Sequence, residues 1–206
     1  MKPEAEGPPG MTTPLRFGTL GTEGSNHSMI VRKSIAFRKL EDAEIVLYTD
    51  FREAFEALVA GDLDFILQVS VHPSHTEMSA RYVHRVHVVD TFIAPSKSLA
   101  IISRSDVDQP RSIAFQPATK HYADLSAWPD QIDEVSIMTV AEGLQAGRFD
   151  SGITSVELVE QAPDRFRIDQ LFGPITDVWV LFGRRPLDIR SLSVWPDAPV
   201  CRYFHE

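Results

Sequence analysis

The sequence is poor in cysteine and in positive charge, and each shortage excludes a class of protein. A single cysteine, Cys201, excludes an internal disulfide framework and a cysteine-rich zinc site, and it favours a reducing compartment. Lysine and arginine total 20 against 29 aspartates and glutamates, which gives a net charge of −9. We therefore expect neither nucleic acid nor an anionic membrane as a partner, and an anionic ligand has to be bound by local groups.

Long apolar runs and familiar catalytic signatures are also missing. No apolar stretch approaches the roughly 20 residues that span a bilayer, and residues 1–14 lack the apolar region of a secretion signal. We read residues 1–14 as a disordered leader and expect a cytoplasmic protein. The seven histidines show no H-E-x-x-H spacing, and no Walker loop, dinucleotide fingerprint or G-x-S-x-G elbow occurs. The sequence predicts no metal and no cofactor.

What is present is an alternation of short apolar strands and helices, which is typical of parallel α/β architecture. Residues 83–104 differ, because two extended segments around Pro95 suggest a crossing between two lobes. Asp50 and Glu53 have capping-box spacing, and Gly61 marks a helix end. The predicted strands are 15–20, 43–48, 63–69, 111–115, 134–138, 149–154, 166–172 and 177–183, and the predicted helices are 26–37, 50–61, a segment near 118–128, 139–147 and 156–162.

A weak internal repeat favours two lobes of similar build. Residues 56–70 and 142–156 align without a gap as E-x-L-x-A-G-x-x-D, although unrelated helix-to-strand connections also share these residue types. Open parallel sheets bind ligands beyond the carboxyl ends of their strands. Ser70, Thr154 and Ser155 at the two strand ends are therefore candidate cleft residues.

The loop GTLGTEGSNHS, residues 18–28, joins the first strand to the first helix. Such a loop gathers unpaired backbone N–H groups at the positive end of a helix, which suits a carboxylate. Ser25 or Asn26 is the expected N-cap. A tight turn without a ligand is the alternative interpretation. The candidate substrate contacts of this loop are Thr22, Glu23, Ser25 and His27.

A second polar segment, residues 115–125, also follows a predicted strand. Pro117 suits the first turn of a helix, whose positive end would again favour an anion. Lys120 and His121 can act as cations toward a carboxylate, and His121 can move protons near neutral pH. A solvated first turn is the alternative. The candidate contacts of this segment are Gln116, Thr119, Lys120 and His121.

His72 and Lys97 are two further candidate site residues because of where the predicted fold places them. His72 follows the strand at the end of the first repeat, where a site role and a loop role are both open. Lys97 lies at the predicted lobe crossing, where a buried ammonium needs an anion to offset its desolvation. Ordinary exposure is the alternative for Lys97.

Four segments occur in an order known from one enzyme family. They are GTEGSNHS (21–28), the stretch from FREAF to VHPS (51–74), AFQPATKH (114–121) and TDVWVLFGR (176–184). Over residues 15–185 the chain resembles the catalytic module of prephenate dehydratase by spacing and pattern more than by identities. The corresponding family segments are Gly-Pro-Glu-Gly-Thr-Phe-Ser, a helix and strand ending in Pro-Ile-Glu-Asn-Ser, Ser-His-Pro-Gln-Ala, and a Thr-Arg-Phe strand.

Two departures from this family pattern bear on the chemistry. The family's Glu-Asn-Ser falls on residues 71–73 (VHP), or shares only Ser74 if the register shifts by one. Its Thr-Arg-Phe falls on residues 177–179 (DVW), which removes an arginine able to bind a carboxylate through two hydrogen bonds and a threonine credited with helping the hydroxyl to leave. Thr176, an additional candidate contact, is adjacent but would face the other side of a strand.

The chain is more similar to the bacilysin-type prephenate decarboxylases, which are short and lose carbon dioxide without expelling the hydroxyl. Since only residues 184–206 follow the last predicted strand, we expect no regulatory ACT domain. The resemblance implies a cofactor-independent lyase of specialised amino-acid or antibiotic biosynthesis. His72 or His121 would supply a proton, and Lys97, Lys120 and the opening loop would hold the remaining carboxylate.

The resemblance also implies a two-lobed α/β fold like the type II periplasmic binding proteins, with a ligand cleft between the lobes. Its parts would be a leader (1–14), lobe one (15–97 plus 176–185), lobe two (98–175) and a C-terminal tail (186–206). Two other functions stay open, namely dehydration of prephenate and non-catalytic binding of a small acid. A homodimer is also left open.

Overall fold

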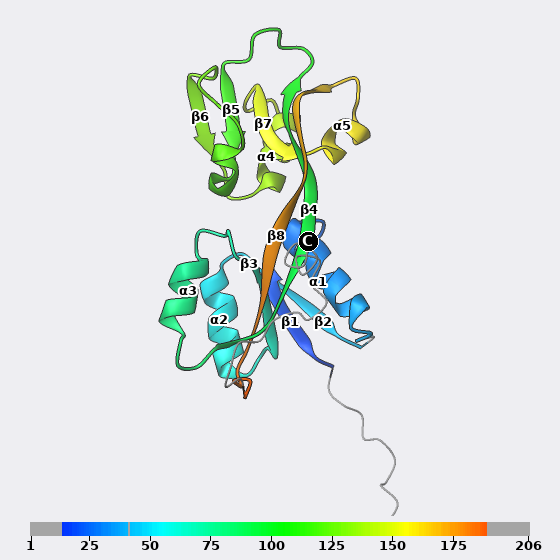
Figure 1. The fold of residues 1–206 in the computed structure, drawn as a ribbon. Coiled ribbons are helices and arrows are strands. Elements are labelled where there is room, and N and C mark those ends of the chain that lie inside the picture. Colours follow the sequence, from blue (N-terminus) through cyan, green and yellow to red (C-terminus); the bar gives the residue numbers. More distant parts are fainter. Residues whose placement is uncertain (1–13, 41, 189–206) are drawn as a thin grey trace, which may run out of the picture.

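A computed structural model of the chain describes residues 14–40 and 42–188. The eight strands in this part of the chain form one mixed sheet in the order β2-β1-β3-β8-β4-β7-β5-β6 (Figure 1). In chain order the elements are β1 (Arg16–Leu20), α1 (Asn26–Phe37), β2 (Glu44–Tyr48), α2 (Phe51–Ala60), β3 (Phe65–Val69), α3 (His75–Arg81), β4 (His87–Arg104), β5 (Ser112–Phe115), the 3-10 helix η1 (Pro117–Tyr122), β6 (Asp130–Asp133), α4 (Ile137–Gln145), β7 (Ser151–Ser155), α5 (Glu157–Gln161) and β8 (Phe166–Gly183).

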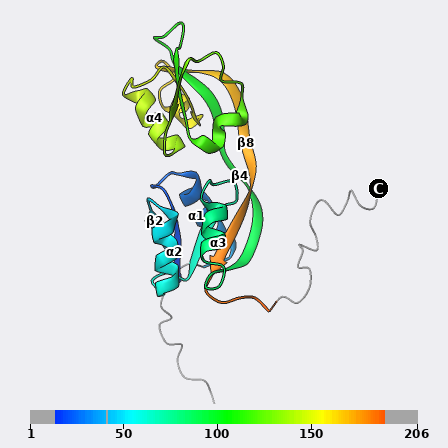
Figure 2. The ribbon, with the colours of Figure 1, turned by 90° about the vertical axis from the view of Figure 1, so that its left-hand side faces the viewer.

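Two long antiparallel strands, β4 and β8, connect two lobes (Figures 1 and 2). We call the part with β1–β3 and α1–α3 the first lobe, and the part with β5–β7, η1, α4 and α5 the second lobe. β8 pairs with β3 in the first lobe, and β4 pairs with β7 in the second. The two-lobed α/β fold predicted from the sequence is thereby confirmed. The boundary between residues 97 and 98 stays a prediction, because β4 and β8 run through both lobes.

Each lobe has a hydrophobic core on both faces of its part of the sheet. In the first lobe, α2 and α3 pack on one face, and α1 packs on the other around Phe17 and Trp179. In the second lobe, α4 and α5 cover Ala100 and Ile102, whereas the neighbouring Ile101 belongs to the opposite core. This alternation follows from the two-residue period of a strand.

Two of the first-lobe helices, α1 and α2, begin and end where their sequence signals predict, whereas the short helix α3 was not predicted. α1 starts after Ser25, whose side chain accepts a hydrogen bond from the backbone N–H of Ser28. α2 ends at Gly61, which has a φ of 94° in the left-handed region that glycine tolerates. The capping box predicted from Asp50 and Glu53 is replaced by a simpler cap, in which Asp50 accepts a hydrogen bond from the N–H of Arg52 at 2.8 Å.

Several second-lobe predictions were wrong. The segment near 118–128 contains only the short 3-10 helix η1, and the strand predicted at 134–138 lies earlier, at β6. The reason for the second error is that Ser136 caps α4, accepting a hydrogen bond from the N–H of Thr139, so the apolar residues that follow are helical. A local cap therefore outweighs an apolar run.

The crossing segments also differ from their prediction. Residues 83–104 were expected to hold two extended segments, and 166–172 and 177–183 two strands, yet β4 and β8 are each single 18-residue strands. The break expected between the two segments near Pro95 is instead a shift in the pairing register of β4 and β8 between Pro95 and Ser98. β7 pairs with β4 only from Leu99 onward, so Pro95 lies where the missing N–H of proline is tolerated.

Two predictions fall largely outside the described residues. The leader (1–14) is described only at Pro14, and the tail (186–206) is described only as far as Asp188. Cys201 is also outside. In the described part of the chain, no helix has the length and apolar character needed to cross a membrane.

Candidate functional site

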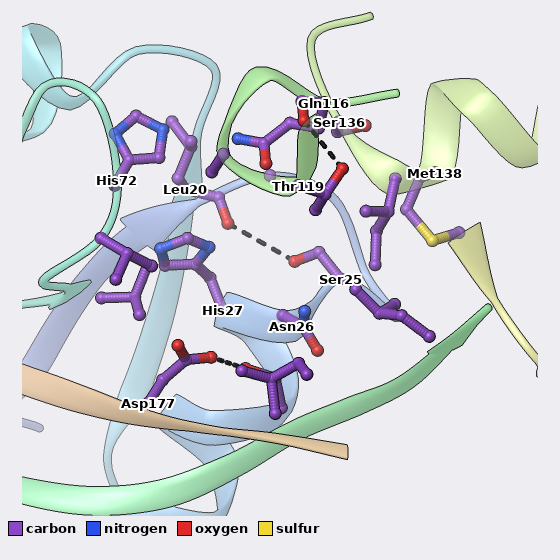
Figure 3. Close-up of a pocket in the computed structure, with 18 of the residues that line it drawn as sticks. Leu20, Ser25, Asn26, His27, His72, Gln116, Thr119, Ser136, Met138 and Asp177 are labelled. Atoms are coloured by element: carbon purple, nitrogen blue, oxygen red, sulfur yellow. Dashed lines mark hydrogen bonds between the residues drawn. The ribbon is translucent and has the colours of Figure 1, made fainter. Parts of the chain in front are cut away.

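A cleft with a volume of about 110 Å³ lies between the two lobes (Figure 3). This volume suits a small organic ligand, because roughly 10–15 Å³ is enough for one water molecule. The first lobe contributes the loop before α1 and residues after β3, the long strands contribute Ser96, Leu99, Ile175, Asp177 and Trp179, and the second lobe contributes η1 and the start of α4. Much of the wall is apolar, through Leu20, Val69, Val71, Leu99, Ala118, Val135, Ile137, Met138, Ile175 and Trp179.

Two helix N-termini from opposite lobes meet at this cleft. α1 begins beside it at Ser25, and α4 begins beside it at Ser136. Unpaired N–H groups and the helix dipole favour an anion at such positions. Gly21 shapes the first of these ends, because its φ is +98° and a Cβ there would lie 2.8 Å from the Oγ of Ser25. A carboxylate can therefore be held by backbone groups.

His27 carries an unsatisfied polar atom inside the cleft wall. Its Nε2 is buried and has no hydrogen-bond partner among the described residues. Burial, followed by the neighbouring His72, lowers the pKa of His27 to about 3, so the ring is neutral. The ring lies against Phe51 and Trp179, with centroids 5.5 and 5.2 Å away. Buried polar atoms normally have a partner, so this unsatisfied nitrogen is an unusual feature of the cleft wall.

His72 is oriented by a chain of side chains behind it. Its Nδ1 lies 2.8 Å from the Oγ of Ser74. Gln68 donates to the same Oγ at 3.1 Å, and the Oε1 of Gln68 lies 3.1 Å from the Nδ1 of His75. Burial and then the charge of His75 lower the pKa of His72, with Asp50 opposing them. His72 is therefore a neutral hydrogen-bonding group of the wall.

Among the described lining residues, Asp177 is the only aspartate or glutamate, and there is no lysine or arginine. It is only 8% exposed on β8. Ser96 on β4 donates a hydrogen bond to its Oδ2. Burial raises the pKa of the Asp177 carboxyl, and the bond from Ser96 opposes this rise. The cleft therefore contains a buried carboxyl group that is weaker as an acid than usual.

The structure brings five of the predicted site residues to the cleft wall, namely Ser25, His27, His72, Gln116 and Thr119. Of these, Thr119 uses its hydroxyl locally, donating a hydrogen bond to the backbone carbonyl of Gln116 at 2.8 Å. Gln116 has no side-chain cap bond to η1. Its amide is therefore the freer polar group on this wall.

The remaining predicted site residues do not line the cleft. They are Thr22, Glu23, Ser70, Lys97, Lys120, His121, Thr154, Ser155 and Thr176. Lys97 forms an ion pair with Glu157 at 2.5 Å, and the ammonium of Lys120 lies 5.6 Å from the ring centre of Phe115. The cations expected to hold a carboxylate are therefore engaged elsewhere.

Other predicted site residues lie outside the cleft because they make contacts elsewhere or face another side of the sheet. The hydroxyl of Thr154 donates to the backbone carbonyl of Ile137 at 2.6 Å, and Glu23 pairs with Arg32. Thr176 is exposed whereas Asp177 is buried, because successive residues of a strand face opposite sides. The opposite orientation of Thr176 was expected from the sequence.

Sequence reasoning missed the side chains that complete the site, namely Asn26, Ser96, Tyr122, Ser136, Met138 and Asp177. Asn26 was considered only as a cap, yet its Oδ1 accepts a hydrogen bond from the backbone N–H of Lys97 at 2.7 Å. For Asp177 a signal was available, because it replaces the threonine of the family pattern on a strand face that points inward.

No family model and no curated protein matches this sequence. Solved structures do match. The chain is similar to a prephenate dehydratase from Arthrobacter aurescens, solved in complex with L-Phe, with a TM-score of 0.59, 14% identity and coverage of 86% of this chain and 63% of that one. It therefore spans less than two thirds of the length of that protein.

A periplasmic domain and a transporter's binding-protein component are also similar. The periplasmic VFT2 domain of BvgS from Bordetella pertussis has a TM-score of 0.53 at 13% identity, with coverage of 82% of this chain and 80% of that one. A binding-protein component of an ABC phosphonate transporter from Pseudomonas aeruginosa has a TM-score of 0.51 at 14% identity, with coverage of 88% and 70%. At these identities the likeness shows a fold common to a dehydratase and to binding proteins.

Proposed function

We propose that the protein is a lyase that removes carbon dioxide from prephenate, or from a close cyclic dicarboxylate, without making the ring aromatic. The observation that carries the proposal is that the cleft offers hydrogen bonds to one carboxylate of the substrate but offers little to stabilise a second. Helix N-termini provide for one carboxylate, whereas much of the remaining wall is apolar and no lysine or arginine occurs among the described lining residues.

This arrangement favours the loss of one carboxylate over the release of a hydroxyl. A carboxylate held against apolar side chains lacks the solvation that stabilises it in water, whereas the departing carbon dioxide is uncharged. The carboxylate at the α1 and α4 termini keeps its hydrogen bonds and fixes the substrate. Such chemistry corresponds to the bacilysin-type decarboxylases that the sequence resembles.

Dehydration of prephenate is the second candidate function, because Asp177 falls on the threonine of the dehydratase pattern. A buried carboxyl at that position can protonate a leaving hydroxyl. The loss of the family arginine at Val178 disfavours this reaction, since Val178 provides no hydrogen bond to the substrate carboxylate. The two reactions give different products, so product analysis separates them.

The test is to incubate the protein with prephenate and to measure carbon dioxide together with the alkaline absorbance of phenylpyruvate. We expect carbon dioxide without phenylpyruvate. Release of both in equal amounts identifies the dehydratase. Release of neither, with prephenate recovered unchanged while it stabilises the protein against heat, identifies a binding protein.

Two matched variants test whether the activity arises in the cleft. Ala118 lines the cleft, whereas Ala127 is exposed elsewhere in the same lobe. Ala118→Trp should fill the cleft and abolish turnover, and Ala127→Trp should retain it. Equal activity of the two variants would place the reaction outside this cleft.

A further inference from the structure

The proposed reaction requires an acid, and this inference rests on the proposed function. When the bond between the ring and its carboxylate breaks, the electron pair moves into the ring's two double bonds. The ring carbon at the far end then gains electron density and forms a bond to a proton. One proton is consumed for each carbon dioxide released, so a group in the cleft has to deliver it.

Most polar side chains of the cleft are unsuited to this step. His27 and His72 are neutral because burial lowers the pKa of both rings, and a neutral imidazole is a poor acid. Burial and then the charge of Asp177 raise the pKa of the Tyr122 hydroxyl, which makes that phenol a weaker acid than usual. His121 does not line the cleft.

Asp177 differs from these groups in its position and in its surroundings. It projects from β8 into the same space as Asn26 and His27 from α1 (Figure 3). Ser96 holds one carboxyl oxygen, Oδ2, by donating a hydrogen bond to it. A proton on the carboxyl group would therefore reside on the other oxygen, Oδ1.

Among the described residues that line the cleft, no lysine or arginine neutralises Asp177. α1 contributes Asn26 and the neutral His27, the turn after β3 contributes the neutral His72, and η1 contributes Tyr122. On β4 the nearest charged residue in sequence is Lys97, whose ammonium is paired with Glu157. An ionised Asp177 would share a largely apolar cleft with a dianionic substrate, and like charges in such a place repel strongly.

We propose that Asp177 is the acid of this cleft and that it donates its proton to the ring carbon of the substrate that gains electron density as carbon dioxide leaves. The negative charge of the departing group is thereby transferred to Asp177, which regains a proton from solvent after product release. Ser96 is a positioning residue, which fixes the carboxyl group through Oδ2.

The test measures carbon dioxide release from prephenate as a function of pH for the wild-type protein and for Asp177→Asn. The wild-type kcat/KM should fall about tenfold for each pH unit above the pKa of Asp177. Asp177→Asn should lower kcat by about 10²–10⁴-fold while KM changes little, and this pH-dependent fall should be lost. In heavy water the wild-type product should carry one deuterium on the protonated ring carbon.

Two further variants make the outcome specific. Ser96→Ala should move the fall in activity to higher pH, because the hydrogen bond from Ser96 lowers the pKa of Asp177. Asp108→Asn removes an exposed carboxyl group outside the cleft and should match the wild-type profile. Thermal unfolding of each variant verifies that it is folded.

The results separate this inference from the proposed function. An active wild-type protein whose Asp177→Asn variant keeps its rate within about threefold, with an unchanged pH profile, overturns the assignment of Asp177 and leaves the lyase in place. A wild-type protein that releases no carbon dioxide from prephenate overturns the proposed function, and the assignment of Asp177 with it.

Discussion

The two walls of the cleft are built from different chemistry. The first-lobe wall holds His27 and His72, and Asp177 lies beside it on the shared strand β8. The second-lobe wall, from η1 and the start of α4, offers a helix N-terminus, small polar groups and apolar side chains, with Tyr122 as its titratable group. In the proposed reaction, Asp177 beside the first-lobe wall supplies the proton, while the second-lobe wall mainly binds and encloses the ligand.

The largest expected contrast concerns how firmly the aromatic side chains of the two walls are packed. Trp179 is 1% exposed and belongs to the first-lobe core with Phe17. Trp179→Ala should lower the free energy of unfolding by about 3–5 kcal/mol. Tyr122 is half-buried against Phe172, so Tyr122→Ala should cost no more than about 2 kcal/mol. Urea titration measures both, and equal losses would show that the second-lobe wall is packed as firmly as the first.

A second contrast is the acid sensitivity of the first-lobe wall. The pKa of His27 is about 3 in the folded protein and near 6.5 when unfolded. The unfolded chain therefore binds more protons as the pH falls between these values, and the folded state loses stability by a few kcal/mol. Urea titrations from pH 7 to pH 3 should show this loss, and His27→Gln should reduce it.

His84 provides the control for this experiment, because it is exposed and does not line the cleft. His84→Gln should leave the acid sensitivity of the wild-type protein in place. If His27→Gln retains the full loss of stability on acidification, His27 is not the neutral buried group described above.

The two helix caps allow a direct comparison of the walls. Ser25 caps α1 and Ser136 caps α4, so Ser25→Ala and Ser136→Ala should each cost about 1 kcal/mol of stability. Both variants should also weaken binding of prephenate, measured by calorimetry, because each disturbs an N-terminus that holds a carboxylate in the proposed function. If only Ser25→Ala weakens binding, the N-terminus of α4 does not contact the ligand.

The smallest expected effect concerns stability at Asp177. Burial raises the pKa of this carboxyl in the folded protein, so the stability that the protonated form contributes is lost as the pH rises through that pKa. Asp177→Asn avoids this loss and should be more stable than the wild type by up to about 1 kcal/mol at pH 7. The gain in melting temperature should be small near pH 4 and should grow as the pH rises through the folded pKa of Asp177, and a gain that is the same at pH 4 and at pH 8 would contradict the raised pKa.

The sequence predicted the first lobe better than the second for a physical reason. α1 and α2 have clear caps at Ser25, Asp50 and Gly61, and local signals of this kind act in the same way in any fold. The second lobe relies on a four-residue strand, β6, and on a 3-10 helix, which are too short to produce a period in the sequence. The start of α4 was therefore mistaken for a strand.

The site was predicted in part because some of its residues belong to one continuous loop. Ser25 and His27 follow from the β1–α1 connection alone. Ser96 and Asp177 meet only because β4 and β8 pair over their whole length, and separate segments give no local signal of such a contact. Lys97 and Lys120 were chosen for their charge, which does not reveal the partners Glu157 and Phe115.

The most direct test of the central claim follows prephenate labelled with carbon-13 in its ring carboxylate during incubation with the protein. The account predicts that the label appears as carbon dioxide and bicarbonate, while the product keeps its hydroxyl group and a non-aromatic ring in the nuclear magnetic resonance spectrum. Label that remains in unchanged prephenate, or that is released together with an aromatic product, would contradict it.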